Sequence, residues 1–298
     1  MIAVRFALYG ALGGSFGLSA FSIYGLRAGE RRDALALKLW LIGSAVVGLL
    51  LSAVALPLLA ASMAGRPPWP IDRDAIGMLL SGSATGAAWE ARMWALIVVL
   101  VAAGRASRLG LVALASGIAL ATLAWTGHGA MDEGAIGWVH RIADILHLLA
   151  AGAWVGALLG LILLAARPLR RADAAHLALT HRAIHGFGMV GTIIVTILVI
   201  TGLINAWLLV GPGNVAALGM TLYGKLLLAK LALFAAMLGL AALNRFRLTP
   251  RFEASIAAAD HRGALGALRR SLAVETACIV AILALVAWLG TLEPPMSV

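Results

Sequence analysis

The sequence predicts an all-α fold: a polytopic membrane helix bundle of about eight transmembrane helices. Hydrophobic residues make up 62% of the chain and charged residues only 12%. Soluble domains contain roughly 45–50% and 25% of these classes. The hydrophobic residues also fall into long runs, and about 20 such residues are needed for one helix to cross a bilayer. Composition and run length therefore both indicate a membrane protein.

Eight apolar runs are long enough to span a membrane. The first is expected to be a span and not a signal peptide, because its apolar core is too long and no small-residue cleavage site follows it. The Pro- and Gly-rich segment after the second run is expected to be irregular and partly interfacial. We expect an N-terminal four-helix half, 1–126, and a C-terminal four-helix half, 127–298. The predicted spans are 4–26, 36–60, 88–104, 108–126, 138–166, 186–210, 221–243 and 271–291.

The basic residues predict the orientation of the bundle. Sixteen of the 23 Lys and Arg residues lie in or beside the first, third, fifth and seventh connections, whereas only Arg66 and Arg73 lie in the second. Basic residues in short loops favour the cytoplasm. Both termini are therefore expected on the periplasmic side. Arg5, Glu90 and Arg92 flank their spans on that side and are expected to act as anchors at the rim.

Several function classes are excluded by the sequence. The net charge of +10 comes from short basic clusters between apolar runs, which is typical of topology signals and not of a nucleic-acid surface. The single cysteine, Cys278, can form no disulfide within the chain and no thiolate cluster. No nucleotide-binding loop, GxSxG or HExxH motif is present, so we expect neither an ATP-driven pump nor another enzyme.

Titratable residues gather in the stretch WTGHGAMDEGAIGWVHRIADILHLLAAGAW, residues 125–154. His128 closes the fourth span, and His140, Asp144 and His147 follow at i, i+4 and i+7 of the fifth. On a helix these three fall within roughly 60° of one another, and Trp154 continues their stripe. Ionisable residues within a span usually face a bundle interior or a wet cavity.

This cluster predicts a metal site on the outer side. Imidazole suits copper, zinc, nickel and iron, and thioether favours Cu(I). His128, His140 and His147 are the candidate ligands, with Met131 as a further one. Asp144 could hold a histidine N–H and so fix its tautomer. Alternatively, a single histidine serves only as an interfacial anchor or as a hydrogen-bond partner of a neighbouring helix.

Two further spans carry polar residues at a similar depth. Asn205 lies near the outer end of the sixth span. Lys225 and Lys230 lie in the seventh, with Lys230 about two turns deeper. A buried lysine needs a partner, so we expect one of the two lysines to pair with Asp144. The alternative is that both lysines only anchor the helix.

Histidines also occur on the predicted cytoplasmic side. His181 and His185 are spaced i, i+4, which could chelate one metal ion and form an inner site. The simpler interpretation is a solvated basic loop that also contains His176.

Three stretches resemble the copper resistance protein D family of the CopD/PcoD type. They are GHGA followed by DILHLLAAGAWVGALLGL, then VITGLINAWLLV, then TLYGKLLLAKLALFAAMLGLAALNRFRLTP. The similarity is strongest over 138–290, while the upstream spans match in pattern. One departure is HRAIHGFG, where the family often has an Arg-Phe-Ser element. The positions that match the family are His128, His147, Trp154, Asn205, Tyr223 and Lys230.

The resemblance implies copper movement across the bacterial inner membrane, together with a periplasmic copper-binding protein of the CopC type. The sequence thus favours import of copper, as Cu(I), from the periplasm to the cytoplasm. One alternative is a b-type haem electron carrier, although His140 and His147 share one helix and axial pairs come from facing helices. Another is an assembly or sensor protein that binds metal without transporting it.

Overall fold

The fold is helical throughout the part of the chain that the computed structural model describes. Every regular element there is a helix, and eight helices are long and apolar enough to cross a membrane. The predicted fold class and number of spans are therefore confirmed, while the orientation of the termini stays a prediction. The described residues are 1–31, 35–126, 134–167, 174–250, 254 and 261–295.

The spanning helices follow one another with short connections. Hydroxyl side chains begin two of them: Ser83 Oγ accepts a hydrogen bond from the Gly86 N–H at 3.0 Å, and Thr221 Oγ1 accepts one from the Gly224 N–H at 3.0 Å. A 3-10 turn, η2 (Thr122–Thr126), extends α5. The helices are α1 (Ile2–Gly25), α2 (Leu37–Met63), α4 (Ala84–Ala102), α5 (Leu109–Ala121), α6 (Gly134–Ala165), α7 (Ala174–Leu209), α8 (Leu222–Leu243) and α10 (His261–Leu289). The shorter elements are α3 (Arg73–Gly82), η1 (Ala106–Arg108), η5 (Pro212–Ala217) and the π-helical η6 (Asn244–Leu248).

The segment between α2 and α4 is more regular than the sequence predicts. It contains α3, whose first turn is capped by Asp72: Oδ1 accepts hydrogen bonds from the Asp74 N–H at 3.1 Å and the Ala75 N–H at 2.9 Å. Ala75 and Leu79 are buried with residues of α2. The prediction of an irregular segment is therefore wrong over 73–82, because a cap and a small apolar face stabilise a helix there.

The sixth span also differs from its prediction. α7 begins at Ala174 and not at 186, so the three histidines assigned to a loop lie on its first turns. His176 is buried, and its Nε2 lies 2.9 Å from the carbonyl oxygen of Leu164 near the end of α6. The solvated-loop interpretation is wrong for this residue. Its contact with α6 stabilises helical structure where the local sequence is basic.

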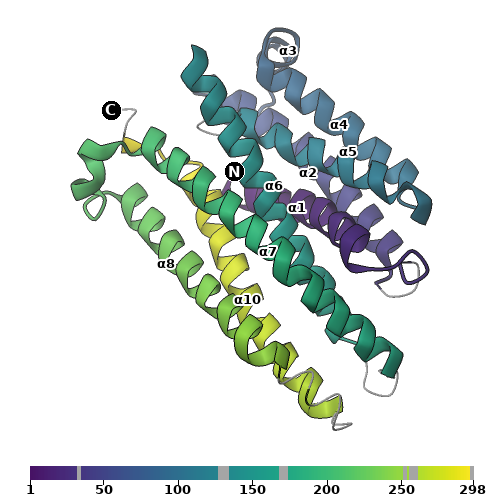
Figure 1. Ribbon diagram of the computed structural model, residues 1–298. Helices are drawn as coiled ribbons and strands as arrows, with labels where there is room; N and C mark the ends of the chain where they lie inside the picture. The colour runs from purple at the N-terminus through teal and green to yellow at the C-terminus, as the bar shows by residue number, and fades with distance from the viewer. Residues whose placement is uncertain (32–34, 127–133, 168–173, 251–253, 255–260, 296–298) are drawn as a thin grey trace.

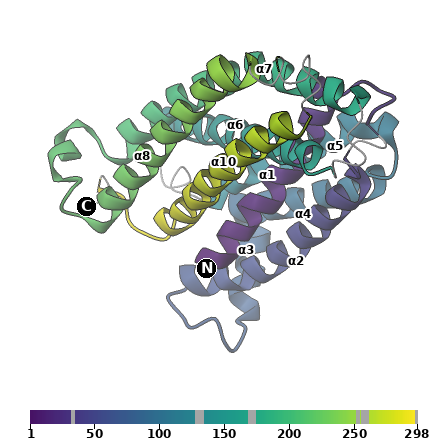
Figure 2. The same cartoon turned by 90° about the horizontal axis from the view of Figure 1, so that it is seen from below.

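Helices α1 and α6 form the centre of the bundle. α1 has its most extensive contacts with α6, and also packs against α2, α5 and α10. In Figure 1, α2, α4 and α5 lie on one side of this pair, and α7, α8 and α10 lie on the other. Figure 2 shows α1 running between the two groups. The two predicted halves are therefore joined along a helix that contacts both.

Glycines allow α1 and α6 to approach closely. A Cβ added at Gly17 would lie 1.9 Å from the carbonyl oxygen of Gly152, and one added at Gly156 would lie 1.9 Å from the carbonyl carbon of Gly17. Gly13 and Gly17 of α1, like Gly152 and Gly156 of α6, are four residues apart. Small residues at this spacing are typical of close helix pairs in membranes.

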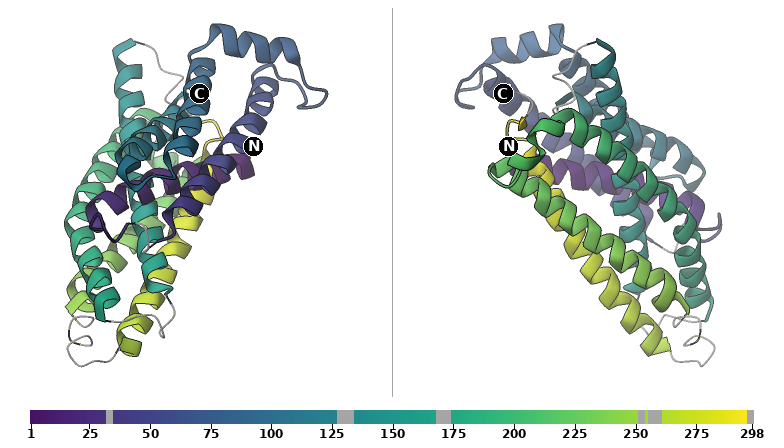
Figure 3. Two further views of the ribbon diagram at one scale, coloured as in Figure 1. Left: turned by 90° about the vertical axis from the view of Figure 1, so that its right-hand side faces the viewer. Right: turned by 60° about the vertical axis from the view of Figure 1, so that its left-hand side comes forward.

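Both termini lie at the same end of the bundle (Figure 3). The guanidinium of Arg5 lies against Gly290, where a Cβ would be 2.6 Å from one of its nitrogens. We call this the terminal end. An even number of spans requires this arrangement, whichever side of the membrane the end faces.

Arginine side chains bind helix ends at the opposite, arginine-rich end. Arg269 of α10 donates to the carbonyl oxygens of Ala165 at 2.7 Å and Arg167 at 2.9 Å, where α6 ends. Arg182 of α7 forms an ion pair with Glu30, which follows α1. Cations near a helix C-terminus stabilise its unpaired carbonyl groups.

Candidate functional site

A polar cluster lies between α6, α7 and α8, toward the terminal end. Its best-defined contact joins the first two helices: Asn205 donates from Nδ2 to Oδ1 of Asp144 at 2.7 Å. Hydrogen bonds between side chains of membrane helices help to fix how the helices pack. The cluster therefore has a defined geometry in the region where the sequence predicts polar residues to converge.

His147 has a partner on the same neighbouring helix. Its Nδ1 lies 2.8 Å from Oγ1 of Thr201. The Thr201 hydroxyl has one proton, which it donates to the carbonyl oxygen of Ile197 at 2.6 Å. The Thr201 oxygen therefore accepts from Nδ1–H of His147. A neutral imidazole with its proton on Nδ1 has a free lone pair on Nε2, which is the form that binds metals.

α8 contributes a positive charge and a hydroxyl group. Lys230 is half-buried, and its ammonium lies within electrostatic range of Asp144 and of His147. Tyr223 is buried, and its hydroxyl lies within electrostatic range of Asp144. Lys225 is exposed. Of the two predicted lysine partners for Asp144, the structure thus favours Lys230.

Two buried polar atoms beside this cluster have no hydrogen-bond partner among the described residues. One is Oδ1 of Asn205, the amide oxygen left over when Nδ2 donates to Asp144. The other is Nε1 of Trp154, whose ring packs edge-on against Phe234 of α8 with centroids 6.3 Å apart. Unsatisfied buried polar atoms are rare and often mark places that a ligand or water occupies. An acceptor and a donor thus remain available beside the cluster.

The structure brings together some of the predicted metal ligands and leaves others undetermined. His140 is fully buried on α6, one to two turns from Asp144 and His147. His128 and Met131 lie outside the described residues. Within the described part of the chain, no three His, Cys, Asp or Glu side chains come together to hold a metal ion. The predicted outer metal site therefore stays a prediction.

The predicted inner pair lies on α7. The rings of His181 and His185 are nearly parallel, at 8° to each other, with centroids 6.4 Å apart. His185 is exposed and His181 is half-buried. No third described His, Cys, Asp or Glu joins them. Their role as an inner site is also still a prediction.

Two residues of the cluster are missing from the predicted site. Thr201 fixes the tautomer of His147, and Phe234 packs against Trp154. Thr201 could have been identified from the sequence, because it lies four residues before Asn205 and so on the same face of the helix. Phe234 lies in a uniformly apolar run, where nothing in the sequence distinguishes it from its neighbours.

Among the described residues, the cluster offers three groups that could contact a cation. It offers one imidazole lone pair, one carboxylate that is partly neutralised by Lys230, and the free amide oxygen of Asn205. Structural metal sites are typically closed by four ligands, whereas a pathway must also release its ion. The described groups are fewer than the four ligands that typically close a structural metal site.

Comparisons with known proteins place these helices in context. A family model described as copper resistance protein D-like, N-terminal domain, matches residues 1–138, and one described as copper resistance protein D matches residues 181–289. The chain is 42% identical over 303 residues to copper resistance protein D of Pseudomonas syringae pv. tomato, covering 99% of this chain and 97% of that protein.

Two further relatives match parts of the chain. Inner membrane protein YebZ of Escherichia coli (strain K12) is 30% identical over 173 residues, which cover 58% of this chain and 55% of YebZ. Copper transport protein CutJ of Bacillus subtilis (strain 168) is 32% identical over 122 residues, which cover 41% of this chain and 21% of CutJ. None of the solved structures matches the chain.

Proposed function

The chain belongs to the copper resistance protein D family, and from this premise we propose that it carries copper across the bacterial inner membrane. The resemblance found in the sequence is thereby confirmed, and eight apolar helices make the chain a multi-pass membrane protein. Relatives named as a copper transport protein and as an inner membrane protein support the proposed cargo and location. We propose no catalytic reaction.

The observation that carries this proposal is the hydrogen bond between His147 and Thr201. It leaves Nε2 of a half-buried imidazole with a free lone pair, inside a membrane bundle and next to a carboxylate. Only a deprotonated nitrogen binds a metal ion, and this hydrogen bond fixes Nε2 as the deprotonated nitrogen of His147.

In this proposal copper first binds at the terminal end. His128, His140 and His147 supply imidazole, and Met131 supplies a thioether that favours Cu(I). Asp144 and Lys230 keep the local charge balanced while the ion passes. Trp154, Asn205 and Tyr223 line the adjacent part of the pathway. His181 and His185, at the arginine-rich end, form the site where the ion leaves toward the cytoplasm.

The orientation of the bundle in this proposal is the one that the basic residues predict. The arginine-rich end faces the cytoplasm and the terminal end faces the periplasm. A periplasmic copper-binding protein of the CopC type would then deliver copper to the terminal end. Alkaline phosphatase fused after Val298 should be active and a fluorescent protein fused there should be dark. The reverse pattern would contradict the proposed orientation.

The deciding experiment measures bound copper in the purified full-length protein. Wild type should bind Cu(I) near stoichiometrically, His128→Ala and His147→Ala should lose it, and His261→Ala is the matched control that should keep it. Proteoliposomes containing wild type should then take up copper, and those containing His147→Ala should not.

The rival functions give different results in the same samples. A Soret band without copper would indicate a b-type haem carrier. Stoichiometric copper with no uptake would indicate an assembly or sensor protein. Copper binding unchanged in both histidine variants would contradict the proposed outer site.

A further inference from the structure

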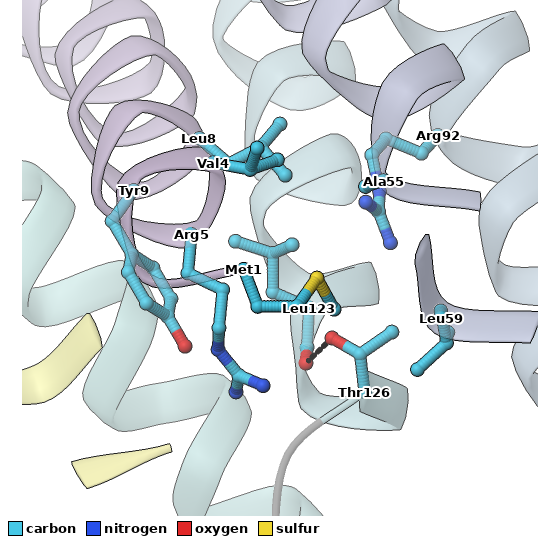
Figure 4. A pocket seen from close by; sticks show the side chains of 10 residues that line it. All are labelled: Met1, Val4, Arg5, Leu8, Tyr9, Ala55, Leu59, Arg92, Leu123 and Thr126. Carbon is cyan, nitrogen blue, oxygen red and sulfur yellow. Dashed lines mark hydrogen bonds between the residues drawn. The ribbon is translucent and has the colours of Figure 1, made fainter. Parts of the chain in front are cut away.

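A second polar site lies in the N-terminal half of the bundle and is lined by none of the residues of the cluster. At the terminal end, α1, α2, α4 and η2 enclose a cavity of about 40 Å³. Arg5 of α1 and Arg92 of α4 both line it (Figure 4). Most of the remaining wall is apolar, including Val4, Leu8 and Leu123.

Arg92 is buried to an unusual degree for a charged side chain. Only 2% of it is exposed, so the prediction that it anchors α4 at the membrane rim is wrong. Its Nε donates to Oγ1 of Thr122 at 2.9 Å, while the Thr122 hydroxyl donates to the carbonyl oxygen of Ala119. Its Nη2 is buried and has no hydrogen-bond partner among the described residues.

Arg5 adds a second positive charge that also has a buried nitrogen without a hydrogen-bond partner. Its Nε is buried and has no hydrogen-bond partner within the described ranges. Its guanidinium, Nε included, lies against Gly290, which directly follows α10. Among the residues that the structure describes, no carboxylate lines the cavity, and Glu90, two residues from Arg92, is exposed.

Two fixed positive charges in an apolar environment require a negative partner. Guanidinium groups stay protonated in proteins, so neither arginine can become neutral on burial. Uncompensated charge inside a membrane protein is costly, and such residues pair or face water. Arginine also presents several N–H donors in one plane, which suits an anion better than a neutral ligand.

We propose that this cavity binds one small monovalent inorganic anion, chloride being the simplest, between Arg5 and Arg92. A cavity of about 40 Å³ has room for a small ion, since roughly 10–15 Å³ of such volume is enough for one water. The bound anion would bridge α1 and α4 and stabilise the N-terminal half. This role is separate from copper, so either proposal can fail without the other.

The test uses detergent-purified full-length protein in which chloride replaces gluconate at constant ionic strength. A ligand that binds only the folded protein raises the melting temperature, here by about 2–5 °C. Tryptophan fluorescence can follow melting because the chain has nine tryptophans. The ³⁵Cl NMR line should also broaden with wild-type protein and narrow again when bromide is added, a readout that needs no variant.

Variants identify the site. Arg92→Met should abolish the chloride dependence of melting, whatever its own melting temperature, and Arg5→Gln should weaken it. Arg105→Met, which changes an exposed arginine just after α4, should keep it. An unchanged melting temperature and NMR line in wild type would overturn the proposal, as would an equal chloride effect in Arg92→Met. Stabilisation by added phosphatidylglycerol in gluconate, without any effect of chloride, would assign the site to a lipid phosphate and would also overturn it.

Discussion

Asn205 on α7 donates a hydrogen bond to Asp144 on α6, and Asp144 also lies within electrostatic range of Lys230 on α8. One carboxylate therefore connects three helices. α8 otherwise packs closely against α10, and its contacts with α6 and α7 are few. The Asp144 carboxylate, together with the Trp154–Phe234 contact, links α8 to α6.

This arrangement predicts that Asp144 and Lys230 depend on each other. Asp144→Asn should lower the free energy of unfolding by about 3 kcal/mol, because it leaves a buried ammonium without its counter-charge. Lys230→Met should be destabilising as well. The double variant should recover most of the loss, and thermal melts of all four proteins give the coupling energy.

The matched control for that cycle is Lys225→Met, since Lys225 is exposed on the same helix. It should change stability by less than about 0.5 kcal/mol. Losses that simply add in the double variant would show that the two charges do not interact.

Thr201 should control copper affinity through His147. Thr201→Val removes the acceptor that holds the proton on Nδ1, and partners that orient a metal-binding histidine are worth about 10–100-fold in affinity. We expect the dissociation constant for Cu(I) to rise at least about tenfold. Competition with a chromogenic chelator measures it.

Two substitutions test whether that effect is specific. Thr201→Ser keeps the hydroxyl and should retain affinity. Thr196→Val changes an exposed threonine of the same helix, whose hydroxyl donates only to the Thr192 carbonyl, and should have no effect. Equal losses in Thr196→Val and Thr201→Val would refute the tautomer argument.

The contact between α1 and α6 should be intolerant of even one methyl group. Gly17→Ala would place its Cβ 1.9 Å from the Gly152 carbonyl oxygen, so the two backbones must separate. Such overpacking costs about 1–3 kcal/mol or more. Gly10→Ala, in the same helix but with nothing within 4 Å of its Cβ, should be neutral or slightly stabilising. Similar melting temperatures for the two variants would contradict the close approach.

The cap of α3 should titrate at unusually low pH. The N–H of Ala75 and the guanidinium of Arg66 hold the pKa of Asp72 below its ordinary value. Because the pKa of Asp72 is lower in the folded protein, the cap stabilises α3 fully at pH values above the ordinary pKa of aspartate. This stabilisation is lost as the pH falls through the lowered pKa of the folded protein. A ¹³C NMR titration should therefore give a midpoint below that of free aspartate. Arg66→Gln should raise it, whereas Arg73→Gln, at a nearby exposed position, should not.

Periodicity within single helices was readable from the sequence, but contacts between helices were not. The spacing of Asp144 and His147 places them on one face of a helix, and the structure has both facing α7. The choice of Lys230 over Lys225 as a partner depends on where α8 packs, which hydropathy does not encode.

The position of Arg92 was also mispredicted because a contact between helices was not readable from the sequence. Its sequence position suggests the membrane rim, yet Thr122 of η2 accepts its hydrogen bond and draws it inward. The early start of α7 likewise depends on His176 reaching the distant Leu164 carbonyl. Each error comes from a tertiary partner that no local pattern reveals.

The arginines that indicate orientation also hold helices together. Arg182 binds Glu30, and Arg269 binds the carbonyl groups at the end of α6. Removing either charge to probe the direction of insertion would loosen the bundle at the same time, and a misfolded protein would be mistaken for an inverted one. Arg105 and Arg108 are exposed, and their side chains form no hydrogen bond or ion pair with the other described residues. Substitutions meant to test orientation alone are therefore best made at these two positions.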